Sequence, residues 1–304
     1  MLKFILKDIE GNISELQNPV KVNIVSSEDA VADSIDAVFA VTGEIPLIQS
    51  INVKDGIRTV FNGLVDRQTQ EVTESGTLLT VRGRSMECVL LDNEALPQTY
   101  CMPSMPLLMK HHFNALGFKE YRGSREAFSG QIDIAKGMSE WAVLSTFCEQ
   151  FLGCKPKIDK NGIIDVTGEE CSEKIYISSD KCLSLKKIFD RSSLISNIYA
   201  RTYTGGTYEM PLENPLAKRL GVTRIRYVNS VDSKSGTVLT AKNIIAKSQN
   251  QYQRCEIDYA ARILCEMGSE LLIDGKKENL RVYELHYTLD RNGEHTKLYA
   301  EVKR

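Results

Sequence analysis

The alternation of apolar and polar positions predicts a long β-hairpin between residues 58 and 85. Two runs of β-prone residues flank a polar stretch, and Thr73 to Gly76 supplies the residues typical of a turn. The apolar positions of the two runs are Val60, Phe61, Leu64, Val65, Leu78, Leu79 and Val81. This pattern favours one hairpin of a small β-barrel or a sandwich.

Further strand patterns precede this hairpin. Residues 2–9 and 51–57 are β-prone, and residues 20–25 alternate as a half-buried strand does. Residues 26–41 fit two structures, because a serine cap and apolar residues at helical spacing compete with a β-prone run. With the hairpin, these patterns give at least five strands in about the first 95 residues, a spacing typical of a small barrel or sandwich.

The composition changes after residue 96, where three prolines form a linker. One helix is predicted from Ser104, its N-cap, to Gly117. A second is predicted from Ser139 to Gly153, with apolar residues recurring at intervals of three and four. Residues 155–166 then read as a hairpin with Asn161-Gly162 at its tip.

The last third of the chain is again rich in strand patterns. Strands are predicted at 175–177, 183–189, 194–203 and 224–231, and a loop at 209–221. A helix capped by Thr240 is predicted to carry Ile244, Ile245, Tyr252, Cys255, Tyr259 and Ile263. A closing hairpin joins 282–289 to 297–302 through Asn292-Gly293.

These elements predict a β-rich α+β fold. We expect two similar small β-barrels with a small helix-containing α/β insert, at residues 1–96, 173–304 and 97–172 respectively. The similarity of the barrels is suggested by a partial internal repeat in the sequence. The residues Arg58…Asp66-Arg67…Gly76 of the first hairpin resemble Arg281…Asp290-Arg291…Gly293 of the last one.

Composition narrows the class of protein further. The formal net charge is −2 and the pI about 6.2, so the chain lacks the excess of Lys and Arg that proteins need to wrap nucleic acid. None of the eight cysteines forms a Cys-x-x-Cys pair, which favours reduced, buried thiols. We expect neither a signal peptide nor a membrane-spanning segment.

Catalytic, cofactor-binding and metal-binding residues are all expected to be absent. The sequence contains no Gly-x-Gly-x-x-Gly, Walker or Gly-x-Ser-x-Gly motif. His111 and His112 are adjacent in a predicted helix and therefore point about 100° apart, so an exposed or half-buried helical position is favoured over a metal site. His286 and His295 are expected at ordinary surface positions. Trp141, at helical spacing with its apolar neighbours, is expected to pack in a core rather than bind carbohydrate.

Two motifs carry a resemblance to a known family. The first consists of Gly83-Arg84-Ser85, Leu90-Leu91-Asp92, Pro97 and Tyr100, and the second of Asp190, Ser193, Ile195, Ser196 and Asn197. Together they resemble the baseplate hub proteins of contractile-tailed phages, the Mu-like and late-control families. The resemblance is strongest over residues 61–92 and 190–197, and it implies strand-like structure at 26–41.

This resemblance implies a structural protein and not an enzyme. It implies a homotrimeric ring in the tail or baseplate of a phage, prophage or phage-tail-like bacteriocin, assembled in the bacterial host cytoplasm. The expected partners are the hexameric tail tube, the central spike and the tape measure protein, and DNA would pass the channel without specific binding. Two alternatives remain open: a receptor- or carbohydrate-binding tail protein, and a cell-wall hydrolase with an unrecognised site.

Overall fold

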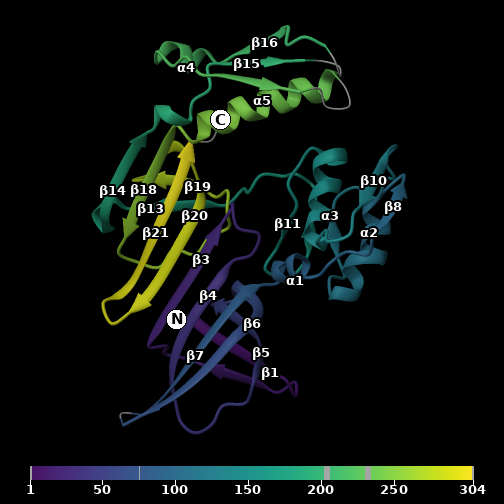
Figure 1. Ribbon diagram of the computed structural model, residues 1–304. Coiled ribbons are helices and arrows are strands. Elements are labelled where there is room, and N and C mark those ends of the chain that lie inside the picture. The colour runs from purple at the N-terminus through teal and green to yellow at the C-terminus, as the bar shows by residue number, and fades with distance from the viewer. Residues whose placement is uncertain (1, 75, 202–205, 230–233, 303–304) are drawn as a thin grey trace. The chain divides into compact units, whose positions relative to one another are not determined.

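A computed structural model of the chain describes residues 2–74, 76–201, 206–229 and 234–302 (Figure 1). The β-rich α+β fold expected from the sequence is confirmed. The chain divides into two compact units. The first comprises Met1–Cys171, Arg262–Cys265 and Leu285–His295, and the second comprises Ser172–Ala261, Glu266–Glu284 and Thr296–Arg304.

The first unit is built on a sheet in the order β3-β4-β7-β6-β5-β1-β2, antiparallel throughout. Its strands are β1 (Leu2–Asp8), β2 (Ile13–Leu16), β3 (Lys21–Ser27), β4 (Ser34–Val41), β5 (Ile48–Asp55), β6 (Arg58–Thr73) and β7 (Gly76–Ser85). The predicted hairpin is therefore β6 and β7, and the strand alternative is correct for residues 34–41.

The sheet of the first unit is strongly curved. Burial alternates along β1 and β4, so that Phe4 and Phe39 both lie in the core. Three strands separate β1 from β4 in the sheet, yet the two rings meet edge to face with centroids 5.1 Å apart. One face of the sheet is therefore folded around its own side chains, as in a small barrel.

The bend is made where β6 changes partners. The first half of β6 pairs with β5 and the second half with β7, with a bulge between Val65 and Arg67. Gly63 and Gly83 lie where the crossing backbones approach most closely. A Cβ on Gly63 would stand 2.0 Å from the Arg84 carbonyl oxygen, and one on Gly83 would stand 2.3 Å from that of Leu64.

A helical segment follows β7 within the first unit. Its helices are α1 (Glu87–Asp92), α2 (Met105–Leu108) and α3 (Glu140–Phe147); α2 and α3 continue as π-helical turns over Met109–Phe113 and Cys148–Leu152. Its short strands are β8 (Gln98–Cys101), β9 (Tyr121–Arg122), β10 (Gln131–Ile134), β11 (Lys157–Ile158) and β12 (Ile164–Asp165).

The predicted helix boundaries are confirmed by the caps. The Ser139 hydroxyl accepts a hydrogen bond from the Ala142 N–H at 3.2 Å, and Ser104 caps α2 in the same way. Gly117 and Gly153 both end their helices with positive φ. Trp141 packs against the apolar core of this segment, as predicted.

The histidine pair differs from the prediction. His112 is only 2% exposed, and its Nδ1 lies 2.8 Å from Oε2 of Glu140, which is also buried. The Tyr100 hydroxyl lies 2.9 Å from His112 Nε2 and 2.9 Å from Nδ1 of His111, which is exposed. The partners come from α3 and β8, and these polar contacts allow a histidine to be buried.

The second unit contains a sheet in the order β13-β19-β20-β21-β18-β14. Its strands are β13 (Lys174–Ile177), β14 (Cys182–Phe189), β18 (Gln253–Tyr259), β19 (Glu270–Ile273), β20 (Lys276–Asp290) and β21 (Gly293–Val302). The tip of the last hairpin, Leu285–His295, clusters with the first unit.

The two sheets share one strand order. In the first unit the strand order is β3-β4-β7-β6-β5-β1. In the second unit it is β14-β18-β21-β20-β19-β13, so that each strand of one order corresponds to the strand at the same place in the other. The six strands also follow one another along the chain in the same succession, so β6–β7 corresponds to β20–β21. The sheets differ at one end, since β1 and β5 are antiparallel whereas β13 and β19 are parallel. The two hairpins that echo each other in sequence therefore occupy equivalent places.

A smaller layer is inserted between β14 and β18. It consists of β15 (Asn197–Ala200), β16 (Met210–Glu213), α4 (Pro215–Arg219), β17 (Ile225–Val228) and α5 (Lys234–Asn250), with the strands in the order β16-β15-β17. The loop predicted at 209–221 is wrong, because β16 and α4 occupy it. Parts of the strands predicted at 194–203 and 224–231 lie outside the described residues.

The helix predicted from a cap at Thr240 to Ile263 is wrong at both ends, because α5 begins at Lys234 and ends at Asn250. Cys255, Ile257 and Tyr259 are buried at every second position along β18, where they pair with β14 and β21. Tyr252, Cys255 and Tyr259 also fall at intervals of three and four, so this segment satisfies both periods in sequence. Pairing with strands distant in sequence decides between them.

Candidate assembly interface

The first family-like motif forms a polar clasp on the surface of the first unit. Arg84, near the end of β7, donates to both carboxylate oxygens of Asp66 at 2.8 and 2.9 Å, and to both of Asp92 at 3.0 and 2.7 Å. Asp66 lies at the bulge of β6, and Asp92 ends α1. The guanidinium therefore joins the bent hairpin to the following helix through paired, charge-assisted hydrogen bonds. These hydrogen bonds also hold the pKa of Asp92 below its ordinary value.

Replacing Arg84 with alanine should destabilise the first unit by about 1 kcal/mol at neutral pH, because the clasp is a partly exposed ion-pair network. Since the pKa of Asp92 is lowered in the folded state, its contribution is present above the ordinary value of 3.8 and is lost as pH falls below it. Chemical denaturation followed by Trp141 fluorescence at pH 7 and pH 3 measures both effects. Arg82→Ala, on the same strand with one contact to Asp36, is the control and should cost less. An equal loss in both variants would contradict the clasp.

The second motif organises the start of the inserted layer. Asp190 accepts a hydrogen bond from the Ser192 N–H at 2.8 Å, and the Ser193 hydroxyl donates to the Asp190 and Ser248 carbonyls. The Ser196 hydroxyl, which is buried, donates to the Arg224 carbonyl at 2.8 Å. These contacts fix where β17 begins beside β15. Both motifs thus have structural roles.

The outer strand of the second sheet exposes side chains on its core face. In register with β18, Leu185 pairs with Ile257, which is 1% exposed, so the two side chains lie on the same face of the sheet. Leu185 is nevertheless 39% exposed, and Phe189, on the same face, is 57% exposed. Within the described residues, β14 pairs only with β18. An exposed apolar edge strand is a common site of pairing with another chain.

The equivalent strand of the first sheet is covered. Val22 and Ile24 of β3 are 0% and 1% exposed. The Thr288 hydroxyl, in the Leu285–His295 segment of the same unit, donates to Asn23 Oδ1 at 2.8 Å. The two topologically equivalent strands therefore differ mainly in whether the described residues cover them.

No metal-binding arrangement was found among the residues that the structure describes. There, no group of three or more His, Cys, Asp or Glu side chains could hold a metal ion. His286 and His295 are half-buried on the last hairpin. Across the described ranges, no helix has the length and apolar character needed to cross a membrane.

Comparison with solved structures identifies the fold. The tail protein from Neisseria meningitidis MC58 matches with a TM-score of 0.76 and 17% identity, covering 99% of this chain and 96% of that one. The 43 kDa tail protein of prophage MuSo2 from Shewanella oneidensis matches with a TM-score of 0.78 and 17% identity, covering 99% and 98%. An E. coli component of the type VI secretion system, itself structurally similar to T4 tail proteins gp27 and gp5, matches at 0.62 and 9%, covering 99% and 77%.

No family model and no curated protein matches the sequence. The chain nevertheless has the fold of phage tail proteins over nearly its whole length. The resemblance expected from the two motifs is thereby confirmed at the level of the fold. Sequence reasoning missed the exposed face of β14, because Leu185 and Phe189 have the composition of an ordinary core strand.

Proposed function

We propose that this protein is the structural hub of a contractile phage tail or tail-like particle, and that three copies form a ring. The observation that carries the proposal is the repeated strand order of the two sheets. Three copies with two similar sheets each present six similar elements around one axis. Such a ring can bind a six-fold tail tube on one side and a three-fold central spike on the other.

The exposed edge of the second sheet supports a ring of this kind. A closed cyclic assembly uses head-to-tail contacts, in which one surface of each copy meets a different surface of the next. In the proposed ring, a neighbouring copy covers the core face of β14, where Leu185 and Phe189 are exposed. This contact would bury the apolar side chains of β14, as those of β3 are already buried within the single chain.

The proposed role is architectural rather than catalytic. The partners are the tail tube, the central spike and the tape measure protein, and DNA passes through the ring without specific contacts. The particle is assembled in the bacterial host cytoplasm, and the protein ends up in the tail or baseplate of the virion. The fold shared with phage tail proteins supports this placement.

The oligomeric state tests the proposal directly. Size-exclusion chromatography with light scattering should give three times the mass of the 34.1 kDa chain. Negative-stain microscopy of the same sample, viewed face-on, should show a ring with six similar lobes around a central hole. A monomer at every concentration, or a closed dimer, would overturn the trimeric ring.

A further inference from the structure

The inserted layer of the second unit has one covered and one open face. Ile198, Ala200 and Val228 pack with Ala241 of α5 on the covered face. Figure 1 shows α5 lying along one side of the strands of this layer. The open face carries aromatic side chains. Tyr199 and Tyr227 are register partners with stacked rings 6.0 Å apart, and the ring of Tyr208 meets Tyr227 edge to face at 5.1 Å.

Exposure on the open face is greatest along β17. Tyr227 is 65% exposed and Ile225 is 45% exposed. Apolar and aromatic side chains exposed together in this way are typical of protein interaction surfaces.

β17 is also an edge strand with an open backbone. Within the described residues it pairs only with β15. The carbonyls of Arg224 and Val228 accept hydrogen bonds from the Asn197 and Arg201 N–H groups of the β15 side. Because parallel ladders use alternate residues, the backbone groups of Ile225 and Tyr227 point to the opposite edge, where no strand among the described residues pairs with them. The Ile225 carbonyl accepts a hydrogen bond there from the Arg226 side chain.

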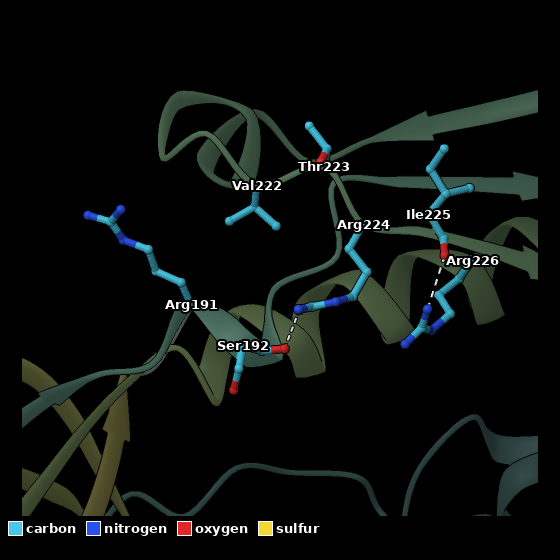
Figure 2. Close-up of a pocket in the computed structure, with 7 residues that line it drawn as sticks. All are labelled: Arg191, Ser192, Val222, Thr223, Arg224, Ile225 and Arg226. Atoms are coloured by element: carbon cyan, nitrogen blue, oxygen red, sulfur yellow. Dashed lines mark hydrogen bonds between the residues drawn. The ribbon is translucent and has the colours of Figure 1, made fainter.

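Three arginines surround this edge. Arg191, Arg224 and Arg226 line an open depression of about 520 Å³ at the start of β17, and Figure 2 shows the side chains of Arg191 and Arg226 on either side of Arg224. Arg224 donates to the Leu194 carbonyl at 2.8 Å and to the Ser192 carbonyl. Arg226 donates to the Ile225 carbonyl at 3.1 Å.

The positive charge at this edge is only partly balanced, because the Asp190 carboxylate interacts with the charge of Arg224. None of the three arginines forms an ion pair with a carboxylate in the part of the chain that the structure describes. The nearby Asp190 carboxylate is engaged by the Ser192 N–H and, at 3.7 Å, by Arg254.

We propose that β17 is a docking edge for an extended acidic segment of a partner polypeptide, which adds to the sheet as a further strand. Such a segment would pair its backbone with Ile225 and Tyr227. Its side chains would alternate, so that apolar residues meet the exposed face of Tyr227 and Ile225 while carboxylates meet Arg226 and Arg191.

The open backbone edge favours a polypeptide over a single-stranded nucleic acid. Arginines and tyrosines could serve either ligand, but only a polypeptide can continue the hydrogen-bond ladder of β17. The inference does not depend on the trimeric ring, since all of its residues belong to the second unit. The mass of the purified protein tests the ring, and probe binding tests this edge.

Binding of a labelled octapeptide to the full-length protein tests the proposal. The probe alternates glutamate and valine and has blocked ends. Three control probes are a peptide of the same composition with its glutamates and valines in two blocks, an alternating lysine–valine peptide and an octamer of deoxythymidylate. Fluorescence anisotropy measures affinity, and hydrogen–deuterium exchange reports the backbone of residues 224–229.

We expect the alternating acidic peptide to bind and to protect residues 224–229 from exchange. Arg226→Glu should weaken its affinity about tenfold or more, as expected for loss of a charge-assisted hydrogen bond and reversal of the charge. Lys242→Glu is the matched control, because Lys242 is exposed on α5 and does not line the depression at the start of β17. Its affinity for the peptide should equal that of the unmodified protein. Arg191→Glu is a second variant in case Arg226→Glu fails to fold.

Four outcomes would overturn the proposal. Equal binding of the block peptide, or binding without exchange protection, would show attraction by charge alone. Tighter binding of the deoxythymidylate octamer would assign the edge to nucleic acid. A change of oligomeric state in Arg226→Glu would assign it to a second copy of the chain. Failure of the acidic peptide to bind would remove the docking edge altogether.

Discussion

Replacing Leu185 with aspartate should convert the proposed trimer into monomers without unfolding the protein. Leu185 lies on the core face of β14 and is already 39% exposed in the single chain, so aspartate there costs the monomer little. In the ring, the same position would be buried against the next copy, where an unpaired carboxylate is strongly unfavourable. Loss of one interface hot spot should lower the association constant by at least about thirtyfold.

Light scattering over a dilution series measures this change, and thermal unfolding shows that the variant is folded. Phe189→Asp, on the same face of β14, should act in the same direction. Ile57→Asp is the matched control, since Ile57 is a fully exposed apolar residue in the turn between β5 and β6. The assignment of β14 to the ring interface fails if both β14 variants remain trimeric, or if Ile57→Asp dissociates the ring as readily.

Local signals allowed much of the fold to be predicted. Ser139 and Gly153 bound a helix because a cap and a left-handed glycine act within a few residues of the backbone they stabilise. The hairpin around Gly76 followed from its alternation and its turn. The similarity of the two sheets was visible only as an echo between two hairpins, and strand order now gives it a structural basis.

The errors arose where distant partners decide the structure. Cys255 and Tyr259 satisfy helical and strand spacing equally, and only pairing of β18 with β14 and β21 places them in a sheet. His112 is buried because Glu140, on another helix, reaches its ring. The spacing of residues within the predicted helix cannot show that Glu140 lies beside His112 in the folded chain.

The candidate interface was harder to predict than the fold. The family-like motifs indicated the correct fold, and Arg84 and Ser196 within them form hydrogen bonds inside the chain. The surfaces proposed for interaction were recognised because Leu185 and Tyr227 are exposed among the described residues. Such exposure depends on the whole tertiary structure, so a single sequence cannot show it.

Replacing Gly63 with alanine should destabilise the first unit severely, by at least about 3 kcal/mol. Gly63 pairs with Ile51 on β5 and with Ser85 on β7, at the point where β6 changes partners. An added Cβ would lie 2.0 Å from the Arg84 carbonyl oxygen, which is a backbone atom and cannot rotate away. Relief of this clash requires β6 and β7 to separate, which breaks the ladder and shifts Arg84 away from Asp66.

Chemical denaturation followed by Trp141 fluorescence measures this loss, because the single tryptophan lies in the first unit. Gly43→Ala is the control: Gly43 has a φ of +77° but no atom within 4 Å of the added Cβ. Only the strain of a left-handed alanine remains there, about 1–2 kcal/mol. Gly63→Ala therefore measures the cost of a steric clash with a neighbouring backbone, whereas Gly43→Ala measures the cost of a left-handed backbone conformation. If Gly63→Ala cost no more than Gly43→Ala, the sharp bend of β6 would not depend on a missing side chain, and another cause of the curvature would be needed.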